Sequence, residues 1–222
     1  MMLTDLPLAL AGNIASAAGL TVFAAGASFL FGFPLAVALL AMRASGWMPL
    51  RLLVMTYVSL IRGTPALLQI LVAYYVIPAA IGINLSPLTA GIVALALNTA
   101  AFTSEVLRGS LNTVPTGQRA AARALGMNPL TMWLHVLLPQ VFYRSLPPLT
   151  SEFGIVLKAT SLLSVISVTE LAAVSRETSL QTHQPLEVFA ATAAVYFVIL
   201  LIASTTSRRL EARVARYLPN GT

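Results

Sequence analysis

The sequence has no cysteine, one lysine and one aspartate, and only 9% of its residues are charged. The absence of cysteine excludes disulfides and thiolate metal ligands. A soluble domain usually carries about 25% charged residues, because polar side chains must cover its surface. This chain is 58% hydrophobic and would expose large apolar patches in water. The composition therefore predicts a protein that resides in a lipid bilayer.

Long uncharged runs supply the segments that a bilayer requires. A helix needs about 20 apolar residues to cross roughly 30 Å of hydrocarbon. Turn-forming residues such as Pro78, Gly82 and Pro87 divide these runs. We predict an all-α integral membrane protein whose residues 1–222 form a single domain of about five transmembrane helices. The expected spans cover roughly residues 14–42, 52–77, 88–107, 146–168 and 188–207.

The basic residues predict an orientation in the membrane. The net charge is +6, and the arginines lie between apolar runs rather than in one patch, so we expect no nucleic-acid partner. Cytoplasmic loops are enriched in arginine and lysine. Placing the N-terminus outside and the C-terminus in the cytoplasm puts nearly all arginines inside and leaves only Arg176 in an outer loop. The inner set is Arg43, Arg51, Arg108, Arg119, Arg123, Arg144, Arg208, Arg209, Arg213 and Arg216.

The sequence contains no motif for catalysis or for energy conversion. A phosphate-binding P-loop needs glycine immediately before its lysine, whereas Leu157 precedes the only lysine, Lys158. His135 and His183 lack the spacing of metal ligands. We expect no catalytic, metal or cofactor site in this chain. If the protein drives transport, either another subunit or an ion gradient must supply the energy.

Residues 114–140 form the longest segment between predicted spans and contain residues that typically start and end helices. Pro115 suits a first helical turn, and the alanine-rich run 116–125 favours a helix that Gly126 ends. Asn128 then caps a second helix, with Pro129 at its first position. We expect two short helices joined at a sharp corner on the basic side of the membrane. The residues alone leave two interpretations open: docking of another protein, or an amphipathic helix on the lipid headgroups.

The same segment resembles the cytoplasmic signature loop of bacterial ABC importer permeases, where Glu-Ala-Ala is followed after three residues by Gly and later by Leu-Pro. The matching residues are Ala121, Ala122, Gly126, Leu138 and Pro139, while Ala120 stands in place of the glutamate. In that family the loop is a coupling helix that sits in a cleft of the ATPase subunit. The resemblance implies an ATPase-docking site made of Ala120, Ala121, Ala122, Gly126, Met127, Asn128 and Pro129.

Four further stretches resemble one branch of that family, the polar amino-acid permeases. They are residues 61–65, residues 97–109, residues 146–149 and residues 158–162. Ala159 stands where the branch usually has aspartate, and Ser151 where asparagine is usual. The resemblance implies a permease subunit of the bacterial inner membrane that translocates a polar amino acid and is not itself an enzyme. The cytoplasmic coupling helix would lie between spans three and four.

The resemblance also implies the partners. They are two ATP-binding subunits that hold ATP and Mg²⁺, a second permease copy or a paralogue, and a periplasmic or tethered amino-acid-binding protein. The chain itself would bind no cofactor and would contact lipid and its amino-acid substrate. The alternatives are a small gradient-driven carrier or channel, which needs no protein partner, and a membrane scaffold that transports nothing.

Polar residues inside the predicted spans are candidates for the substrate path, because ionisable groups at membrane depth face the protein interior or water. Lys158, Thr160 and Ser161 offer a cation and two hydroxyls that would suit an amino-acid carboxylate. We add Glu105 and Asn98 to this path. An alternative is that Lys158 is structural and bonds helix-end carbonyls.

Two arginines are expected in a different role. Arg62 and Arg108 are placed, like Glu105, near inner ends of spans. There they would form ion pairs or extend to the headgroups.

Overall fold

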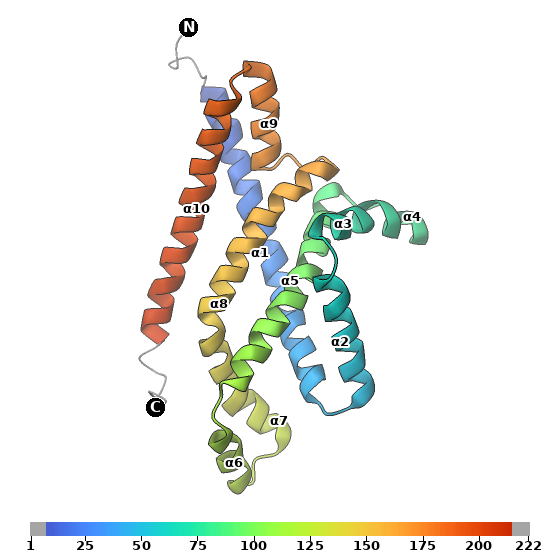
Figure 1. Cartoon of the computed structure of the whole chain (residues 1–222), viewed down its shortest axis with the longest axis vertical. Helices are drawn as coiled ribbons and strands as arrows, with labels where there is room; N and C mark the ends of the chain where they lie inside the picture. The colour runs from blue at the N-terminus through green and yellow to red at the C-terminus, as the bar shows by residue number, and fades with distance from the viewer. Residues whose placement is uncertain (1–7, 215–222) are drawn as a thin grey trace.

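The computed structural model describes residues 8–214, and every element in that range is helical. The elements in chain order are α1 (Leu8–Ala44), α2 (Met48–Arg62), α3 (Ala66–Leu71), a π-helical stretch (Val72–Val76), α4 (Ile77–Ile81), α5 (Pro87–Asn112), α6 (Thr116–Ala124), α7 (Pro129–Met132), a second π-helical stretch (Trp133–Leu137), α8 (Leu138–Ala159), a 3₁₀ segment (Thr160–Ile166), α9 (Leu171–Thr182) and α10 (Pro185–Val214) (Figure 1). The all-α class predicted from the sequence is confirmed.

Four helical stretches of the described chain are long and apolar enough to cross a membrane, and a bent pair makes a fifth if it is counted as one span. They are Asn13–Ala44, Pro87–Asn112, Pro129–Ile166 and Pro185–Arg209, with the bent pair Met48–Arg62 and Ala66–Ile81. The expected spans 14–42, 88–107 and 188–207 fall inside α1, α5 and α10.

The expected second span, residues 52–77, is not one straight helix. The helix axis bends by 105° between its two halves, which are α2 and the series that begins with α3. Pro65 has no backbone N–H and disfavours helical geometry at the residue before it, so α2 ends at Arg62, with Gly63 as its C-cap, and the chain becomes helical again after the proline. Arg62 is the last residue of α2 and lies at this bend.

The second helix of the 114–140 segment is also not short. From Pro129 the chain stays helical to Ile166, which makes one rod of 38 residues, called the α7–α8 rod below. The rod passes Pro139, Pro147 and Pro148 without ending. A π-helical turn, Trp133–Leu137, comes just before Pro139. Because proline has no N–H, a carbonyl in the turn before it loses its hydrogen-bond donor, and the wider π-helical backbone accommodates this loss. The rod ends only at Ser167, whose φ is 66°.

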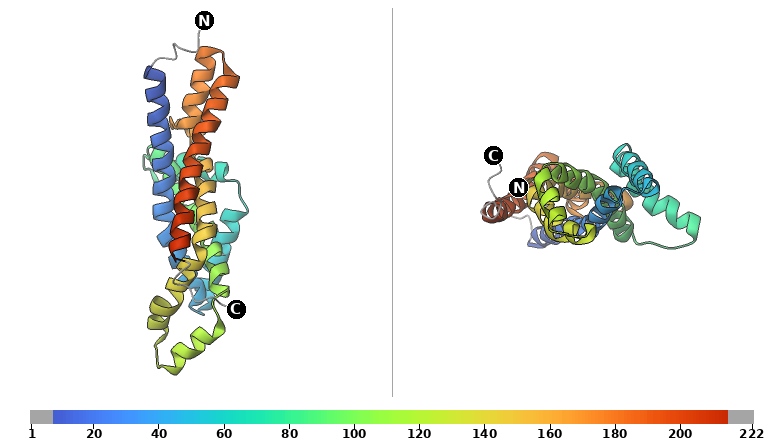
Figure 2. Two further views of the ribbon diagram at one scale, coloured as in Figure 1. Left: turned by 90° about the vertical axis from the view of Figure 1, so that its left-hand side faces the viewer. Right: turned by 90° about the horizontal axis from the view of Figure 1, so that it is seen from below.

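Small side chains hold the centre of the bundle, where α1 and α5 lie against each other (Figures 1 and 2). A Cβ on Gly32 would lie 2.7 Å from the carbonyl oxygen of Ala96, so only glycine allows this approach. Fully buried alanines continue the contact, among them Ala24, Ala36 and Ala100. Close backbone packing through small residues is the usual way in which helices associate in lipid.

The two ends of the molecule differ in charge and in shape. At one end the last turn of α1, the start of α2 and the end of α5 meet, and α6 and α7 project beyond them (Figures 1 and 2). These helix ends carry Arg43, Arg51, Arg108 and Arg119. The opposite end holds α9, with Arg176, beside the starts of α1 and α10. The sequence termini on which part of the orientation rests, residues 1–7 and 215–222, lie outside the described residues.

Hydrogen bonds join α9 to α1 and α10. The sequence analysis treated this segment as an outer loop. Glu170 is fully buried and accepts hydrogen bonds from the backbone N–H groups of Ala172 (2.9 Å) and Ala173 (2.8 Å) at the start of α9. Its carboxylate also accepts from the hydroxyl of Tyr196 on α10 at 3.0 Å. Thr21 of α1 accepts from the N–H of Leu171 at 3.1 Å. Hydrogen bonds therefore join three helices at this end.

Candidate functional site

The projecting corner between α6 and α7 has a fixed backbone geometry. Gly126 has a φ of 72°, a conformation that residues with a Cβ rarely adopt. The N–H of Met127 donates to the carbonyl of Ala122 (3.1 Å), and the N–H of Gly126 donates to that of Arg123 (2.9 Å), which is the Schellman pattern. Asn128 caps α7 by accepting from the N–H of Thr131 at 2.8 Å. The helix stop and the cap predicted from the sequence are both present.

Most of the residues expected to dock an ATPase are exposed, but one of them is buried. Ala120, Ala121, Gly126, Asn128 and Pro129 are exposed, and Met127 is half-buried. Ala122, by contrast, is only 3% exposed, so its side chain packs inside the protein and offers no surface to a partner.

Two exposed leucines complete this corner. Leu125 is 78% exposed and Leu130 is 66% exposed, although both are large apolar side chains outside the expected spans. The sequence analysis did not select them, although their positions beside the glycine stop and the proline start are the signal. An apolar tip on a rigid corner is suited to insertion into a pocket of another protein.

Glu105 of α5 lies at the centre of an ion cluster. Its carboxylate pairs with Arg43 of α1, with Arg108 of α5 at 2.6 Å and with Arg62 of α2 at 3.9 Å. The Arg62 guanidinium also lies over the Phe102 ring, 5.3 Å from its centre. The expected ion pairs of Arg62 and Arg108 are present. Because three helices contribute cations, the ion pairs of the Glu105 carboxylate join α1, α2 and α5.

Asn98 takes part in a network that supports the bend after α2. Pro65 cannot donate to the carbonyl of Ile61, and the side-chain amide of Gln69 donates to that carbonyl instead, at 2.7 Å. Gln69 also donates to the hydroxyl of Thr64 at 2.9 Å and accepts from Asn98 at 2.9 Å. Asn98 thus fixes the side chain that satisfies the broken helix end. Sequence reasoning missed Gln69, although a glutamine four residues after a mid-span proline is a usable signal.

The three residues Lys158, Thr160 and Ser161 do not present one common surface. Lys158 is exposed, and no carboxylate of the described residues pairs with it. Thr160 is fully buried, and its hydroxyl donates to the carbonyl of Leu157 at 2.7 Å. Ser161 is half-buried and donates to the carbonyl of Lys158 at 2.7 Å. The expectation that Thr160 lines a path with Lys158 is therefore corrected, because its side chain points into the packed core.

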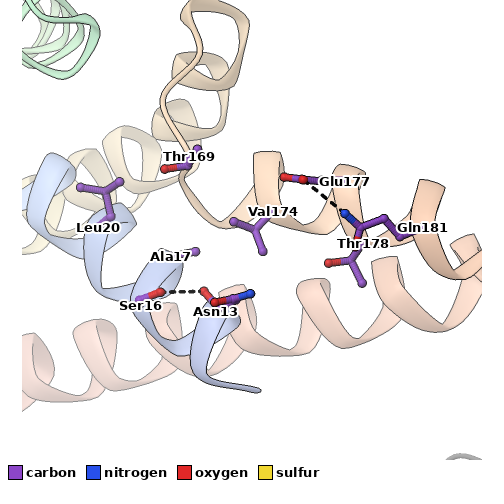
Figure 3. A pocket seen from close by; sticks show the side chains of 9 residues that line it. All are labelled: Asn13, Ser16, Ala17, Leu20, Thr169, Val174, Glu177, Thr178 and Gln181. Carbon is purple, nitrogen blue, oxygen red and sulfur yellow. Dashed lines mark hydrogen bonds between the residues drawn. The ribbon is translucent and has the colours of Figure 1, made fainter. Parts of the chain in front are cut away.

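A polar cavity of about 410 Å³ opens at the opposite end, between the start of α1 and α9. Figure 3 shows Asn13 and Ser16 of α1 facing α9, whose Glu177 accepts a hydrogen bond from Gln181 at 3.3 Å. Within residues 8–214, no three histidine or acidic side chains gather in a way that would hold a metal ion.

The apolar helices, the bend supported by a polar network and the projecting corner define a multi-pass membrane protein of the permease class. The chain belongs to the family of binding-protein-dependent transport system inner membrane components, which it matches over residues 30–216. It is therefore an inner-membrane component with several membrane-spanning helices.

Individual relatives match along nearly the whole chain. The L-cystine transport system permease protein TcyB of Bacillus subtilis is 37% identical over 192 residues, which covers 86% of this chain and 82% of that protein. The arginine ABC transporter permease protein ArtQ of Escherichia coli is 30% identical and covers 92% of this chain and 95% of its own length.

Solved structures agree with the fold. A crystal structure of an amino acid ABC transporter with histidines matches with a TM-score of 0.84 and 31% identity, covering 91% of this chain and 94% of that one. An inward-facing MetNI methionine ABC transporter matches with a TM-score of 0.76 at 19% identity, which supports the fold alone.

Proposed function

We propose that this chain is the permease subunit of an ABC importer for a polar amino acid, and that a separate subunit hydrolyses the ATP. The observation that carries the proposal is the rigid, apolar-tipped corner at α6–α7 in a chain that has no phosphate-binding loop of its own. The relatives support the substrate class, because their names specify cystine, arginine and glutamine transport.

The α7–α8 rod offers a direct mechanical link in this proposal. It runs without a break from the corner at Pro129 to Ile166, and 38 residues at 1.5 Å per residue extend roughly 57 Å. ATP binding would move α6, and the rod would carry that movement to the Lys158–Ser161 region. There Lys158 supplies the cation of the substrate path, beside Ser161, whose hydroxyl donates to the carbonyl of Lys158. Asn98 and Glu105 shape the walls of the path through their fixed partners.

The proposed assembly contains two ATP-binding subunits with ATP and Mg²⁺, a second permease copy or a paralogue, and a binding protein that delivers the amino acid. The end with α6 faces the cytoplasm and the end with α9 faces outside, since cytoplasmic loops collect arginine. Exposed apolar side chains on α10, among them Phe197 and Ile202, leave that helix free to contact lipid or another chain.

Docking is tested by enlarging an exposed alanine on the corner. Ala121→Trp should abolish copurification of the ATPase subunit and ATP-driven uptake in liposomes, because the added ring fills the space that a partner must occupy. Ala212→Trp is the matched control, an exposed alanine on α10. Full uptake by the chain alone without ATP would show a gradient-driven carrier instead.

A further inference from the structure

A cavity of about 690 Å³ lies beside α6, and Pro129 and Leu130 of the projecting corner are among its lining residues. Its walls come from the last turn of α1, the end of α5, α6 itself and the start of the α7–α8 rod. Residues from these four elements include Ala44, Asn112, Arg119, Arg123, Trp133 and Leu137. Because α1 and α5 are membrane spans that end here, the cavity lies at the level where hydrocarbon gives way to lipid headgroups.

The cavity carries positive charge with no counter-ion. Arg119 and Arg123 both line it, and none of its lining residues is acidic. Every ion pair among the described residues involves Glu105, so neither guanidinium is paired. The Nε of Arg119 is buried and has no hydrogen-bond partner in the described structure. Two guanidinium groups that no described carboxylate neutralises make the cavity suited to an anionic ligand.

The remaining walls are apolar. Leu130, Met132 and Trp133 supply the accessible apolar surface, while Leu111 and Leu137 behind them are already buried in the core. A small inorganic anion would leave this apolar surface uncovered. A molecule that combines a phosphate with hydrocarbon would use both parts, since guanidinium groups bind phosphate through charge-assisted hydrogen bonds.

We propose that this cavity binds an anionic phospholipid, with its phosphate on Arg119 and Arg123 and the first part of an acyl chain against Met132 and Trp133. Basic pockets between membrane helices are suited to such headgroups. The proposal rests on the proposed function only in naming the leaflet as the cytoplasmic one. Both arginines stand on α6, Arg119 half-buried and Arg123 exposed, so the bound lipid would set the position of the helix that docks the ATPase.

Native mass spectrometry of the full-length chain in detergent tests the proposal without ATP or transport. Dioleoylphosphatidylglycerol should be retained in preference to dioleoylphosphatidylcholine. The double variant Arg119→Gln/Arg123→Gln should weaken retention roughly thirtyfold, the change that two surface cations contribute. The matched control Arg208→Gln/Arg209→Gln removes the same charge from exposed positions on α10 and should retain the lipid.

A second variant separates the site from general charge attraction and from misfolding. Ala44 is exposed and lines the cavity, so Ala44→Trp fills it without changing charge and should also expel the lipid. Equal retention by all variants would overturn the proposal. Displacement of the lipid by millimolar inorganic phosphate would assign the arginines to a soluble anion instead. Loss of ATPase copurification with unchanged lipid retention would make this a protein-docking surface.

These outcomes are independent of the transport assay. A chain that retains the lipid but shows ATP-independent uptake would overturn the proposed function and leave the lipid site standing. A chain that transports with ATP but retains no lipid would do the reverse.

Discussion

At the scale of single residues, the polar side chains of the spans mostly make hydrogen bonds or ion pairs that stabilise the fold. Gln69 replaces the N–H that Pro65 lacks, and Asn98 orients Gln69. Thr160 donates to Leu157, and Glu105 holds guanidiniums from three helices. Among the five residues expected to form a substrate path, Lys158 is the one whose charge no described residue uses. This difference makes it the residue to test first.

The variant Lys158→Met should reduce amino-acid uptake by the assembled complex by about 10- to 100-fold, because a charge-assisted hydrogen bond contributes about 1.5–3 kcal/mol. The measurement is initial uptake rate against substrate concentration in liposomes with ATP inside. Lys158→Arg keeps the charge and should recover most of the rate. If the methionine variant transports normally while fully assembled, Lys158 is only structural.

At the scale of elements, the connections depend on a few local devices. Gly126 and Asn128 fix the corner of α6 and α7, and a π-helical turn carries the α7–α8 rod past Pro139. At the other end Glu170 caps α9 and ties it to α10. A carboxylate with three donors in a buried site stabilises these helices because each donor would otherwise be unsatisfied.

Replacing that cap tests its contribution. Glu170→Ala should lower the free energy of unfolding by about 2 kcal/mol or more, since it leaves two N–H groups and the Tyr196 hydroxyl without an acceptor. Equilibrium unfolding in mixed micelles measures this change. Glu177→Ala, an exposed carboxylate on the same helix, should change it by less than about 0.5 kcal/mol.

A double-mutant cycle isolates the link to α10. Glu170→Ala and Tyr196→Phe should be non-additive by roughly 1 kcal/mol, because they remove the same hydrogen bond. Additive effects would show that the bond contributes nothing to stability.

At the scale of the whole molecule, the two ends of the bundle differ in charge and in the features that they carry. One end collects arginine-bearing helix ends, the projecting corner and the basic cavity, and the other holds α9 and a polar cavity with one carboxylate. Such a division matches a protein that meets an ATPase on one side of the membrane and a delivered substrate on the other.

The absence of native cysteine allows a direct test of orientation. Single variants Leu125→Cys on the corner and Gln181→Cys on α9 place one thiol at each end. A membrane-impermeant maleimide applied to intact spheroplasts should label only the α9 variant, and both should label in opened membranes. Labelling of the corner variant in intact spheroplasts would reverse the topology.

The sequence by itself determined the membrane class, the approximate spans and the corner, because hydropathy, a glycine stop and an asparagine cap act over a few neighbouring residues. It misjudged the bend at Pro65 and the continuity past Pro139, since a proline's effect depends on whether nearby groups satisfy the freed carbonyl. Only the tertiary structure decided that Thr160 turns inward while Lys158 stays exposed, and that no acid reaches Arg119 and Arg123. Those outcomes depend on contacts between distant helices, which the local pattern of a sequence does not record.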